Sequence, residues 1–143
     1  VQAEVAQADV LVATAAVADW RPTHASDEKI KKDGSGKTPT LNFTENPDIL
    51  AGVASSERAR NGQLFCVGFA AESHDLLSNA QAKRQRKGVP LLAGNIGPAT
   101  FGQDDNALLL IDAHGTLELP HASKLTLARQ LVEQIAQRLP KLT

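Results

Sequence analysis

The sequence has a single cysteine and no methionine, and it lacks any long apolar run. The one cysteine, Cys66, can form neither an internal disulfide nor a cysteine-based zinc site, which fits a reducing cytoplasm. The longest mainly apolar stretch, residues 10–18, is far shorter than the ~20 residues of a membrane-spanning helix. No basic-then-apolar signal segment opens the chain. Because there is no initiator methionine, we expect a piece of a longer protein.

Neither sign of charge dominates the sequence. Lysine and arginine number 15, aspartate and glutamate number 16, and the formal net charge is -1. This balance gives no overall cationic field, so we expect neither nucleic acid nor a membrane as a partner. The hydrophobic share of 42% is enough for a buried core, and 143 residues suit one domain. We therefore expect a single domain over residues 1–143.

Three continuous apolar runs predict strands that are buried on both faces of a parallel sheet. They cover residues 8–17, 64–69 and 90–94. Helical patterns lie between these runs, so strands and helices alternate along the chain. The alternation predicts an α/β fold with a doubly wound parallel sheet.

The first of the helices between the strands has a recognisable start signal. Asn46, Pro47 and Asp48 predict the N-cap, the first helical residue and an acidic first turn. Gly62 is the expected end of this helix. The next helix is expected to end at Gly88.

The C-terminal third has a different pattern. Two apolar segments, residues 107–111 and 116–119, flank a turn at residues 112–115 and predict a β-hairpin. A last helix follows. Its apolar residues are spaced to cover one helix face, and they are Leu125, Ala128, Leu131, Val132, Ile135 and Leu139.

Two well-known phosphate-binding motifs are incomplete or absent. The residues Gly36, Lys37 and Thr38 resemble the end of a P-loop, but Lys31 stands where the first glycine should be. Pro39 also disfavours a helix start at that point. No Gly-x-Gly-x-x-Gly segment occurs. The four histidines share no metal-ligand spacing, so the metal ligands are left unassigned.

Candidate ligand contacts lie where the predicted strands end, because open α/β sheets bind ligands at their carboxyl ends. Ala15 and Ala16 would let the backbone approach a ligand, and Asp19 follows them. The alternative is a turn that packs on the small residues. Phe69 closes the next strand, and it either stacks on a base or fills the core, which is the commoner role. The helix start from Asn46 to Ile49 favours an anion, or it is an ordinary capped helix.

Lysines provide a second candidate feature. Lys83 and Lys87 lie four residues apart on one face of a predicted helix, where they could hold a polyphosphate or simply form a solvated basic end. Lys29 lies with other lysines in a loop expected over residues 22–40. Such a loop is either merely solvated or a mobile lid that closes over an anion. Together these signals predict an anion-binding crevice with a basic lid.

Six motifs occur in a characteristic order along the chain, at residues 15–22, 28–32, 46–50, 67–72, 83–87 and 101–106. This series resembles bacterial phosphopantothenoylcysteine synthetase (phosphopantothenate–cysteine ligase). In that family the ligase is the C-terminal half of a bifunctional flavoprotein of coenzyme A biosynthesis. The resemblance spans nearly the whole chain, and six ordered motifs are far more specific than any one of them.

The resemblance implies a Rossmann-like, three-layer parallel sheet with a C-terminal β-hairpin and helix. It also implies a homodimer in which the hairpin region helps the subunits to associate. The implied substrates are 4′-phosphopantothenate, L-cysteine and CTP, with Mg²⁺, and the implied intermediate is an acyl-cytidylate. FMN would belong only to the decarboxylase half, which is not in this chain.

The resemblance also assigns roles to residues. Lys29 would act at the reacting centre, and Asp19 and Phe69 would contact the nucleotide, Phe69 beside the cytosine. Lys83 and Lys87 would hold phosphates. The other implied nucleotide-binding residues are Ala15, Ala16, Asn46, Pro47, Asp48, Ile49 and Leu50.

Two segments of the family pattern are missing from this sequence, a Gly-Pro-Thr strand turn and a Ser-Asn-x-Ser-Ser-Gly segment. We therefore expect the isolated chain to lack the first strand of the sheet and to be unable to turn over. Two other kinds of protein would fit the pattern, a nucleotide-binding domain without chemistry and a purely structural oligomerisation domain. The first would bind nucleotide regardless of phosphopantothenate, and the second would not respond to CTP and Mg²⁺.

Overall fold

The computed structural model describes residues 1–24, 28–29, 31, 34, 36, 38, 40–72, 74–96 and 102–139. The chain divides into two compact units. The larger is built from Val1–Thr14 and Ile49–Thr143, and the smaller is Ala15–Asp48. The single domain expected over residues 1–143 stays a prediction.

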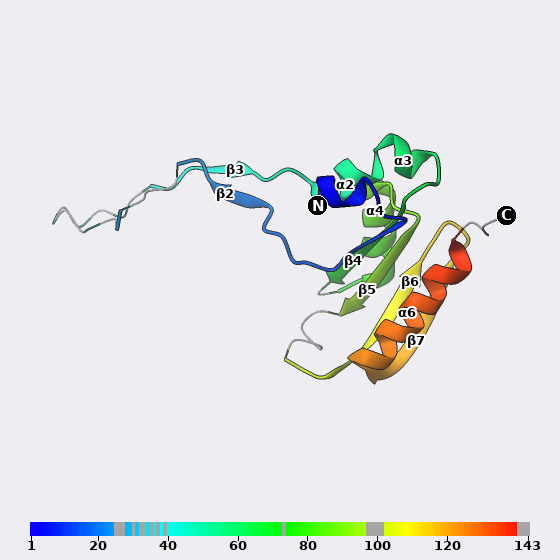
Figure 1. Cartoon of the computed structure of the whole chain (residues 1–143). Coiled ribbons are helices and arrows are strands. Elements are labelled where there is room, and N and C mark those ends of the chain that lie inside the picture. The colour runs from blue at the N-terminus through cyan, green and yellow to red at the C-terminus, as the bar shows by residue number, and fades with distance from the viewer. Residues whose placement is uncertain are drawn as a thin grey trace. The chain divides into compact units, whose positions relative to one another are not determined.

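A five-stranded sheet forms the centre of the larger unit, with the strand order β1-β4-β5-β6-β7 (Figure 1). Its strands are β1 (Val10–Ala13), β4 (Phe65–Glu72), β5 (Leu91–Ile96), β6 (Asp105–Ile111) and β7 (Thr116–Ser123). β1, β4 and β5 are parallel, whereas β6 and β7 are antiparallel to their neighbours. The predicted α/β fold with a C-terminal hairpin is confirmed.

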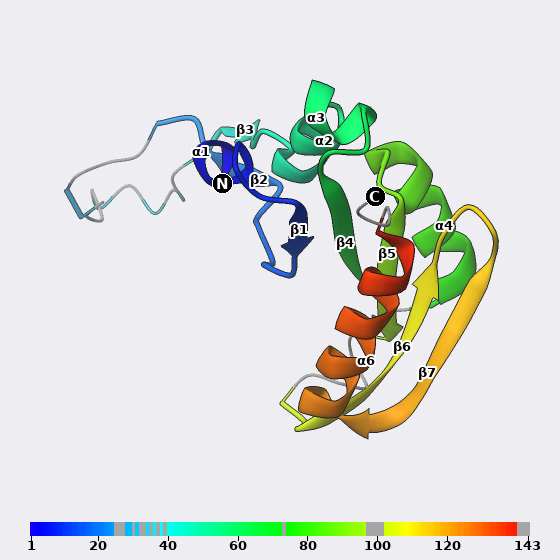
Figure 2. The same cartoon turned by 45° about the vertical axis from the view of Figure 1, so that its right-hand side comes forward.

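Helices lie on both faces of this sheet, which gives the three expected layers (Figure 2). The helices are α1 (Gln2–Val5), α2 (Ile49–Ala54), α3 (Glu57–Arg60), α4 (Leu76–Lys87) and α6 (Lys124–Arg138). Residues of α2 and α4 share one buried cluster with one side of the sheet, and α6 shares a second cluster with the other side. No helix in the described part of the chain is long and apolar enough to cross a membrane.

β1 differs from the fully buried strand that its apolar run predicts. The strand is only four residues long, none of them is buried, and Val12 is 39% exposed. The reason is its place in the sheet, because β4 is its only partner strand among the described residues. The central strands meet the expectation, since Val67 and Leu91 are completely buried.

The helical layer on the α2 and α4 side approaches the sheet very closely at two glycines. A Cβ atom on Gly68 would lie 2.9 Å from both Leu50 Cδ2 and Leu92 Cδ1. A Cβ atom on Gly94 would lie 2.9 Å from Leu76 Cδ1. Real Cβ contacts are longer than this, so a side chain at either position would force a neighbouring leucine to shift.

The C-terminal helix α6 begins as capping rules require, because the Ser123 hydroxyl accepts a hydrogen bond from the Thr126 backbone N–H at 3.2 Å. Its buried face differs from the predicted stripe. The buried residues are Leu127, Leu131 and Ile135, whereas Leu125 and Val132 are 62% and 63% exposed. The expectation was wrong for these two and for Ala128, which is also exposed, because the sheet covers only part of a wide apolar arc.

The smaller unit contains an antiparallel ribbon of β2 (Trp20–Pro22) and β3 (Phe43–Glu45). Asn46 follows β3 and is not a helix N-cap, since α2 begins only at Ile49. Its side-chain amide instead donates to the Ala18 carbonyl at 2.7 Å, and its Oδ1 accepts from Arg21 at 2.8 Å. The Asn46 side-chain oxygen, which would accept a backbone N–H if Asn46 were an N-cap, accepts from Arg21 instead. The basic loop expected over residues 22–40 lies partly outside the described residues, and Pro22 belongs to β2.

Candidate functional site

The carboxyl ends of β4 and β5 form the candidate site of the larger unit. The two strands run parallel and in register, with Ala71 beside Asn95 and Glu72 beside Ile96, so they end together. Helix α4 starts shortly afterwards at Leu76 and packs back against both strands. Parallel sheets bind ligands at this edge, and charged and polar side chains collect on both of its faces.

An ion pair lies on the α4 side of this edge. Lys83 Nζ is 3.9 Å from Glu72 Oε1, and the two side chains are 30% and 21% exposed. Lys83 lies about two turns into α4, so its long side chain reaches back toward the strand end. Lys87 is half-buried one turn further along, about 6 Å farther from the start of α4. The predicted lysine stripe therefore exists, and Lys83 is the member beside the strand ends.

Phe69 lies on the other face of the sheet. Alternation along β4 turns Gly68, Ala70 and Glu72 toward α4, where Ala70 joins the cluster that contains Ala80. Phe69 is half-buried and packs against the opposite cluster, which contains Leu127 of α6. Because Phe69 and Lys83 are on opposite faces, a ligand that touches both must lie across the strand ends.

Sequence reasoning missed Asn95 and gave Glu72 no role. Asn95 is half-buried at the end of β5 and points to the same face as Phe69, because it is paired with Ala71, two residues beyond Phe69. The predicted strand stopped at Gly94, whereas β5 continues for two more residues to Ile96. The rule that ligands bind at strand ends would have found both residues if the strand ends had been placed correctly.

The remaining predicted residues of the larger unit are at the start of α2. Ile49 is 40% exposed. Leu50 packs on the buried cluster and lies over Gly68, so its side chain is part of the core. Any ligand contact by Leu50 would come from its backbone.

Seven predicted site residues belong to the smaller unit. Asn46 is half-buried, and the others are exposed, namely Ala15, Ala16, Asp19, Lys29, Pro47 and Asp48. The Asn46 side chain bonds to the Ala18 carbonyl before β2 and to Arg21 within β2, and the Asn46 backbone N–H also donates to the Asp19 carbonyl at 2.8 Å. The structure thus brings Asp19 and Asn46 together, as a site formed by both would require.

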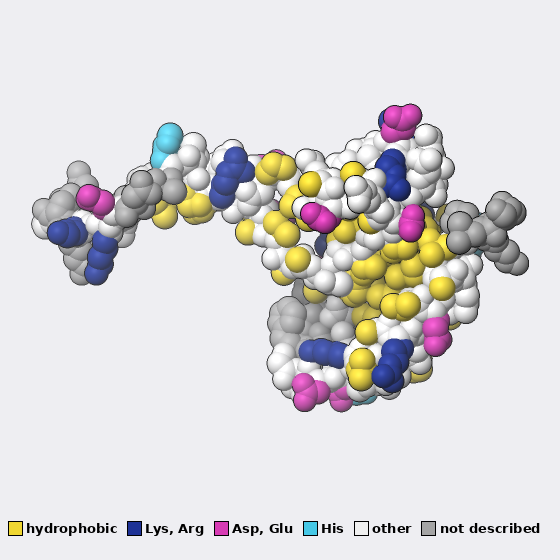
Figure 3. All heavy atoms as spheres, in the orientation of Figure 1, with side chains coloured by type: hydrophobic (Ala, Val, Ile, Leu, Met, Phe, Trp, Pro, Cys, Tyr) yellow, Lys and Arg dark blue, Asp and Glu magenta, His cyan; other side chains and the backbone are white. Residues whose placement is uncertain are grey.

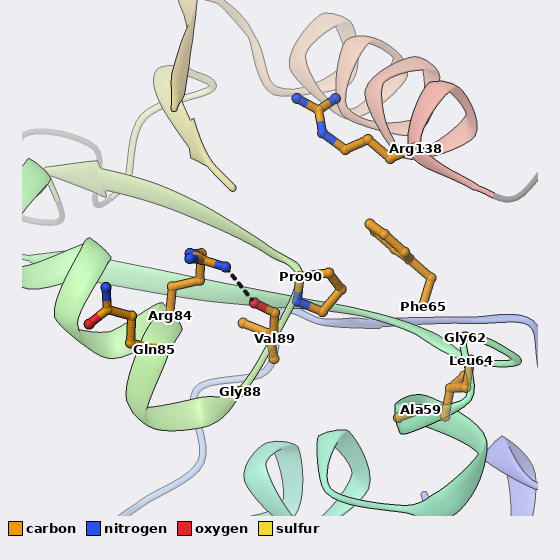
Figure 4. A pocket seen from close by; sticks show the side chains of 10 residues that line it. All are labelled: Ala59, Gly62, Leu64, Phe65, Arg84, Gln85, Gly88, Val89, Pro90 and Arg138. Carbon is orange, nitrogen blue, oxygen red and sulfur yellow. Dashed lines mark hydrogen bonds between the residues drawn. The ribbon is translucent and has the colours of Figure 1, made fainter. Parts of the chain in front are cut away.

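A separate cavity of about 580 Å³ opens at the amino ends of β4 and β5 (Figure 4). Its apolar lining includes Phe65 and Pro90, and Arg84 and Arg138 supply its charges. Arg84 Nη1 donates to the Val89 carbonyl at 3.3 Å, and Arg138 Nη2 pairs with Asp112 Oδ2 at 2.9 Å. Since both guanidinium groups are engaged within the fold, we do not assign a ligand to this cavity.

Among the residues that the structure describes, two titratable groups have shifted pKa values, and both are structural. Burial raises the pKa of the Cys66 thiol, which is only 1% exposed and suits an inert core residue. Burial also raises the pKa of Asp112. Hydrogen bonds from the His114 and Gly115 N–H groups and from Arg138 outweigh that effect and hold the pKa below its ordinary value. In the part of the chain that is described, no three His, Cys, Asp or Glu side chains gather to hold a metal ion.

Comparison with curated proteins finds relatives that share one name, coenzyme A biosynthesis bifunctional protein CoaBC. The Vibrio cholerae protein is 37% identical over 142 residues, which are 97% of this chain and 35% of that protein. The Escherichia coli K12 protein is 38% identical over 142 residues, 96% of this chain and 34% of that protein. The Mycolicibacterium smegmatis protein is 43% identical over 141 residues, 90% of this chain and 33% of that protein. The chain thus spans about a third of each.

Solved structures show the same fold. The crystal structure of the C-terminal domain of CoaBC superposes with a TM-score of 0.73 at 24% identity, covering 96% of this chain and 58% of that one. The DNA/pantothenate metabolism flavoprotein from Streptococcus pneumoniae gives a TM-score of 0.72 at 18% identity, covering 95% and 66%. These agreements confirm the Rossmann-like prediction.

The chain also matches a protein-family model. Residues 1–139 match the family described as the DNA/pantothenate metabolism flavoprotein C-terminal domain. This match covers nearly the whole chain, and the resemblance predicted from the six motifs is confirmed by it together with the CoaBC relatives. This chain belongs to the DNA/pantothenate metabolism flavoprotein C-terminal domain family.

Proposed function

We propose that this chain is part of a ligase of coenzyme A biosynthesis that joins 4′-phosphopantothenate to L-cysteine. The observation that carries the proposal is the family match over residues 1–139, supported by relatives named as bifunctional coenzyme A biosynthesis proteins. The carboxyl edge of β4 and β5 supplies a fitting location, with a cationic side chain on one face and an aromatic one on the other.

The proposed reaction has two steps. The carboxylate of phosphopantothenate attacks the α-phosphate of CTP, which forms an acyl-cytidylate and releases pyrophosphate. The amine of cysteine then attacks the acyl carbon, the bond to CMP breaks, and the amine loses a proton to give phosphopantothenoylcysteine. Activation is needed because a free carboxylate is a poor electrophile. The protein would supply positive charge for the triphosphate and would exclude water from the acyl-cytidylate.

Lys83 is the residue of the larger unit that we assign to the triphosphate. Its ammonium group already lies beside Glu72 at the strand ends. An incoming phosphate would compete with that carboxylate, since Lys83 is partly exposed and can swing away from it. Lys87 would support the phosphate chain from one turn farther along α4, and Phe69 would contact the cytosine.

The smaller unit would contribute the remaining contacts. Lys29 would act at the reacting centre and Asp19 would meet the nucleotide. Ala15 and Ala16 would let the backbone approach it, and the segment from Asn46 to Leu50 would lie against it. CTP would enter with Mg²⁺ on its phosphates, since Mg²⁺ in such sites is held largely by phosphate oxygens and water. A homodimer and a fused FMN-dependent decarboxylase domain belong to the same proposal.

We further propose that the chain alone binds CTP but does not catalyse the reaction with phosphopantothenate. The relatives are about three times longer than the matched region, and the two segments of the family pattern that the resemblance implies, Gly-Pro-Thr and Ser-Asn-x-Ser-Ser-Gly, are not in this sequence. Pyrophosphate release from CTP and phosphopantothenate should therefore be absent with this chain. Robust release by the chain alone would contradict this part of the proposal.

Calorimetric titration with CTP and Mg²⁺ tests the nucleotide site. Lys83→Ala should weaken binding by about 10-fold to 100-fold, because a charge-assisted hydrogen bond contributes about 1.5–3 kcal/mol. The matched control is Lys124→Ala, which removes an exposed lysine at the start of α6 and should change nothing.

The competing functions give different results in the same titration. Binding of CTP by a longer protein that never responds to phosphopantothenate would indicate a nucleotide-binding domain without chemistry. No binding of CTP or ATP at millimolar concentration would indicate a structural domain. Equal affinities of the wild type and Lys83→Ala would remove Lys83 from the site.

A further inference from the structure

Glu72 is the acidic residue of the candidate site, and the proposed reaction gives it no role of its own. It is the last residue of β4, and strand alternation turns it to the α4 face together with Gly68 and Ala70. Its side chain is 21% exposed, and its Oε1 lies 3.9 Å from Lys83 Nζ. A negative charge therefore lies beside the cation that we assign to the triphosphate.

The contact between Glu72 and Lys83 is electrostatic and leaves room for a ligand oxygen. At 3.9 Å the two atoms are too far apart for a direct hydrogen bond, which needs about 3.2 Å or less. A lysine ammonium group has three N–H donors, so it can donate to a phosphate oxygen while it stays near the carboxylate. A phosphate held by Lys83 would consequently lie close to Glu72.

Free CTP and the Glu72 carboxylate repel each other, because both are negatively charged. Since the Glu72 side chain is mostly buried, water and salt screen its charge less than they screen a surface carboxylate. Asp75, another acidic residue near this edge, is the exposed N-cap of α4 and is screened more strongly. Glu72 is therefore the stronger local obstacle to a free triphosphate.

The surface of the larger unit offers little general attraction for an anion. The formal net charge of the chain is -1. Figure 3 shows basic and acidic side chains interspersed over the visible face of the larger unit, without a broad patch of either sign. Binding of a triphosphate must therefore depend on a few charges near the strand ends, and Glu72 is one of them.

We propose that Glu72 makes the site specific for the magnesium complex of CTP over free CTP, an inference that rests on the proposed function. Mg²⁺ prefers oxygen ligands and is commonly bound by one or two carboxylates together with substrate phosphates. A cation between Glu72 and the phosphates turns their repulsion into attraction, while Lys83 neutralises other phosphate oxygens. Because the described residues bring no three His, Cys, Asp or Glu side chains together, the phosphates and water would supply most of the metal ligands.

The alternative role for Glu72 is a structural ion pair that only holds Lys83 in place. In that role, replacing Glu72 would weaken the binding of CTP whether or not magnesium is present. Selection for the magnesium complex predicts opposite changes under the two conditions. The neutral variant Glu72→Gln keeps the size of the side chain, so it should bind free CTP more tightly and the magnesium complex less tightly.

Calorimetric titration of the chain with CTP, once in EDTA and once in Mg²⁺, tests the inference. Wild-type protein should bind CTP at least about tenfold more tightly in Mg²⁺ than in EDTA. Glu72→Gln should bind CTP in EDTA about 3-fold to 10-fold more tightly than the wild type, and its preference for magnesium should nearly disappear. Glu72→Ala is a second variant with the same expected pattern. The matched control is Glu133→Gln, which removes an exposed carboxylate on α6 and should change neither affinity.

The outcomes separate this inference from the proposed function, and thermal unfolding of each variant checks that the fold is kept. Weaker binding by Glu72→Gln under both conditions, or an unchanged magnesium preference, would overturn the inference alone. A preference that survives Glu72→Gln but is lost in Asp19→Asn would also overturn it, because Asp19 would then select the magnesium complex. If Lys83→Ala binds CTP in Mg²⁺ as tightly as the wild type, the proposed triphosphate site fails as well. Absence of CTP binding by the wild type under both conditions would overturn both proposals.

Discussion

Replacing Gly68 by alanine should destabilise the larger unit, because β4 and α2 meet there without room for a methyl group. The new Cβ would lie 2.9 Å from Leu50 Cδ2 and 2.9 Å from Leu92 Cδ1. Leu92 is fully buried and cannot move outward. Overpacking of this kind costs about 1–3 kcal/mol, and the reduced entropy of the unfolded chain returns about 0.4–1 kcal/mol. The expected net loss is about 1–2 kcal/mol.

Gly52→Ala is the matched control for this prediction. Gly52 lies inside α2, and a Cβ atom there meets nothing within 4 Å. The same chemical change should therefore stabilise the protein by about 0.5–1 kcal/mol. Urea unfolding measures the stability of both variants. If the free energy of unfolding falls by about 2 kcal/mol per M urea, the unfolding midpoints of Gly68→Ala and Gly52→Ala should differ by about 1 M. Equal or higher stability of Gly68→Ala would refute the close approach. In the double variant Gly68→Ala/Leu50→Ala, the loss of stability should be smaller than the sum of the losses in the two single variants.

Three other changes are expected to have measurable effects. Ser123→Ala removes the cap of α6 and should cost about 0.5–2 kcal/mol in urea unfolding, with Ser123→Asp restoring most of it. Leu131→Ala leaves a cavity under α6 and should lower the stability by about 2–5 kcal/mol. Val132→Ala should cost much less because Val132 is 63% exposed, and a loss as large as that of Leu131→Ala would contradict this exposure. The lowered pKa of Asp112 stabilises the fold above the unfolded pKa of about 3.9, and the stability is lost as the pH falls through the lower folded value. Asp112→Asn should therefore show a shallower loss of stability between pH 5 and pH 2.

The central sheet could be predicted because its physical signal is local. β4 and β5 are buried on both faces, so nearly every residue in them is apolar, and the pattern needs no knowledge of the neighbours. Gly88 was likewise predictable as the end of α4, since it has a φ of 66° that favours glycine. Signals of this kind depend on a few adjacent residues.

The misplaced features depend on distant partners. The run around β1 has the composition of a central strand, yet its burial is set by how many strands flank it. Asn46 has the side chain of a good N-cap, but Arg21 and the Ala18 carbonyl engage it instead. On α6 the spacing of apolar residues defines an arc, and only the sheet decides which half of it is buried. None of these choices can be made from a window of neighbouring residues.

The arrangement of the candidate site restricts how any ligand could lie on it. Glu72 and Lys83 are on the α4 face, whereas Phe69 and Asn95 are on the α6 face, and only the ends of β4 and β5 separate the two pairs. A nucleotide held by both would run across the strand ends, with its phosphates toward α4 and its base on the other side.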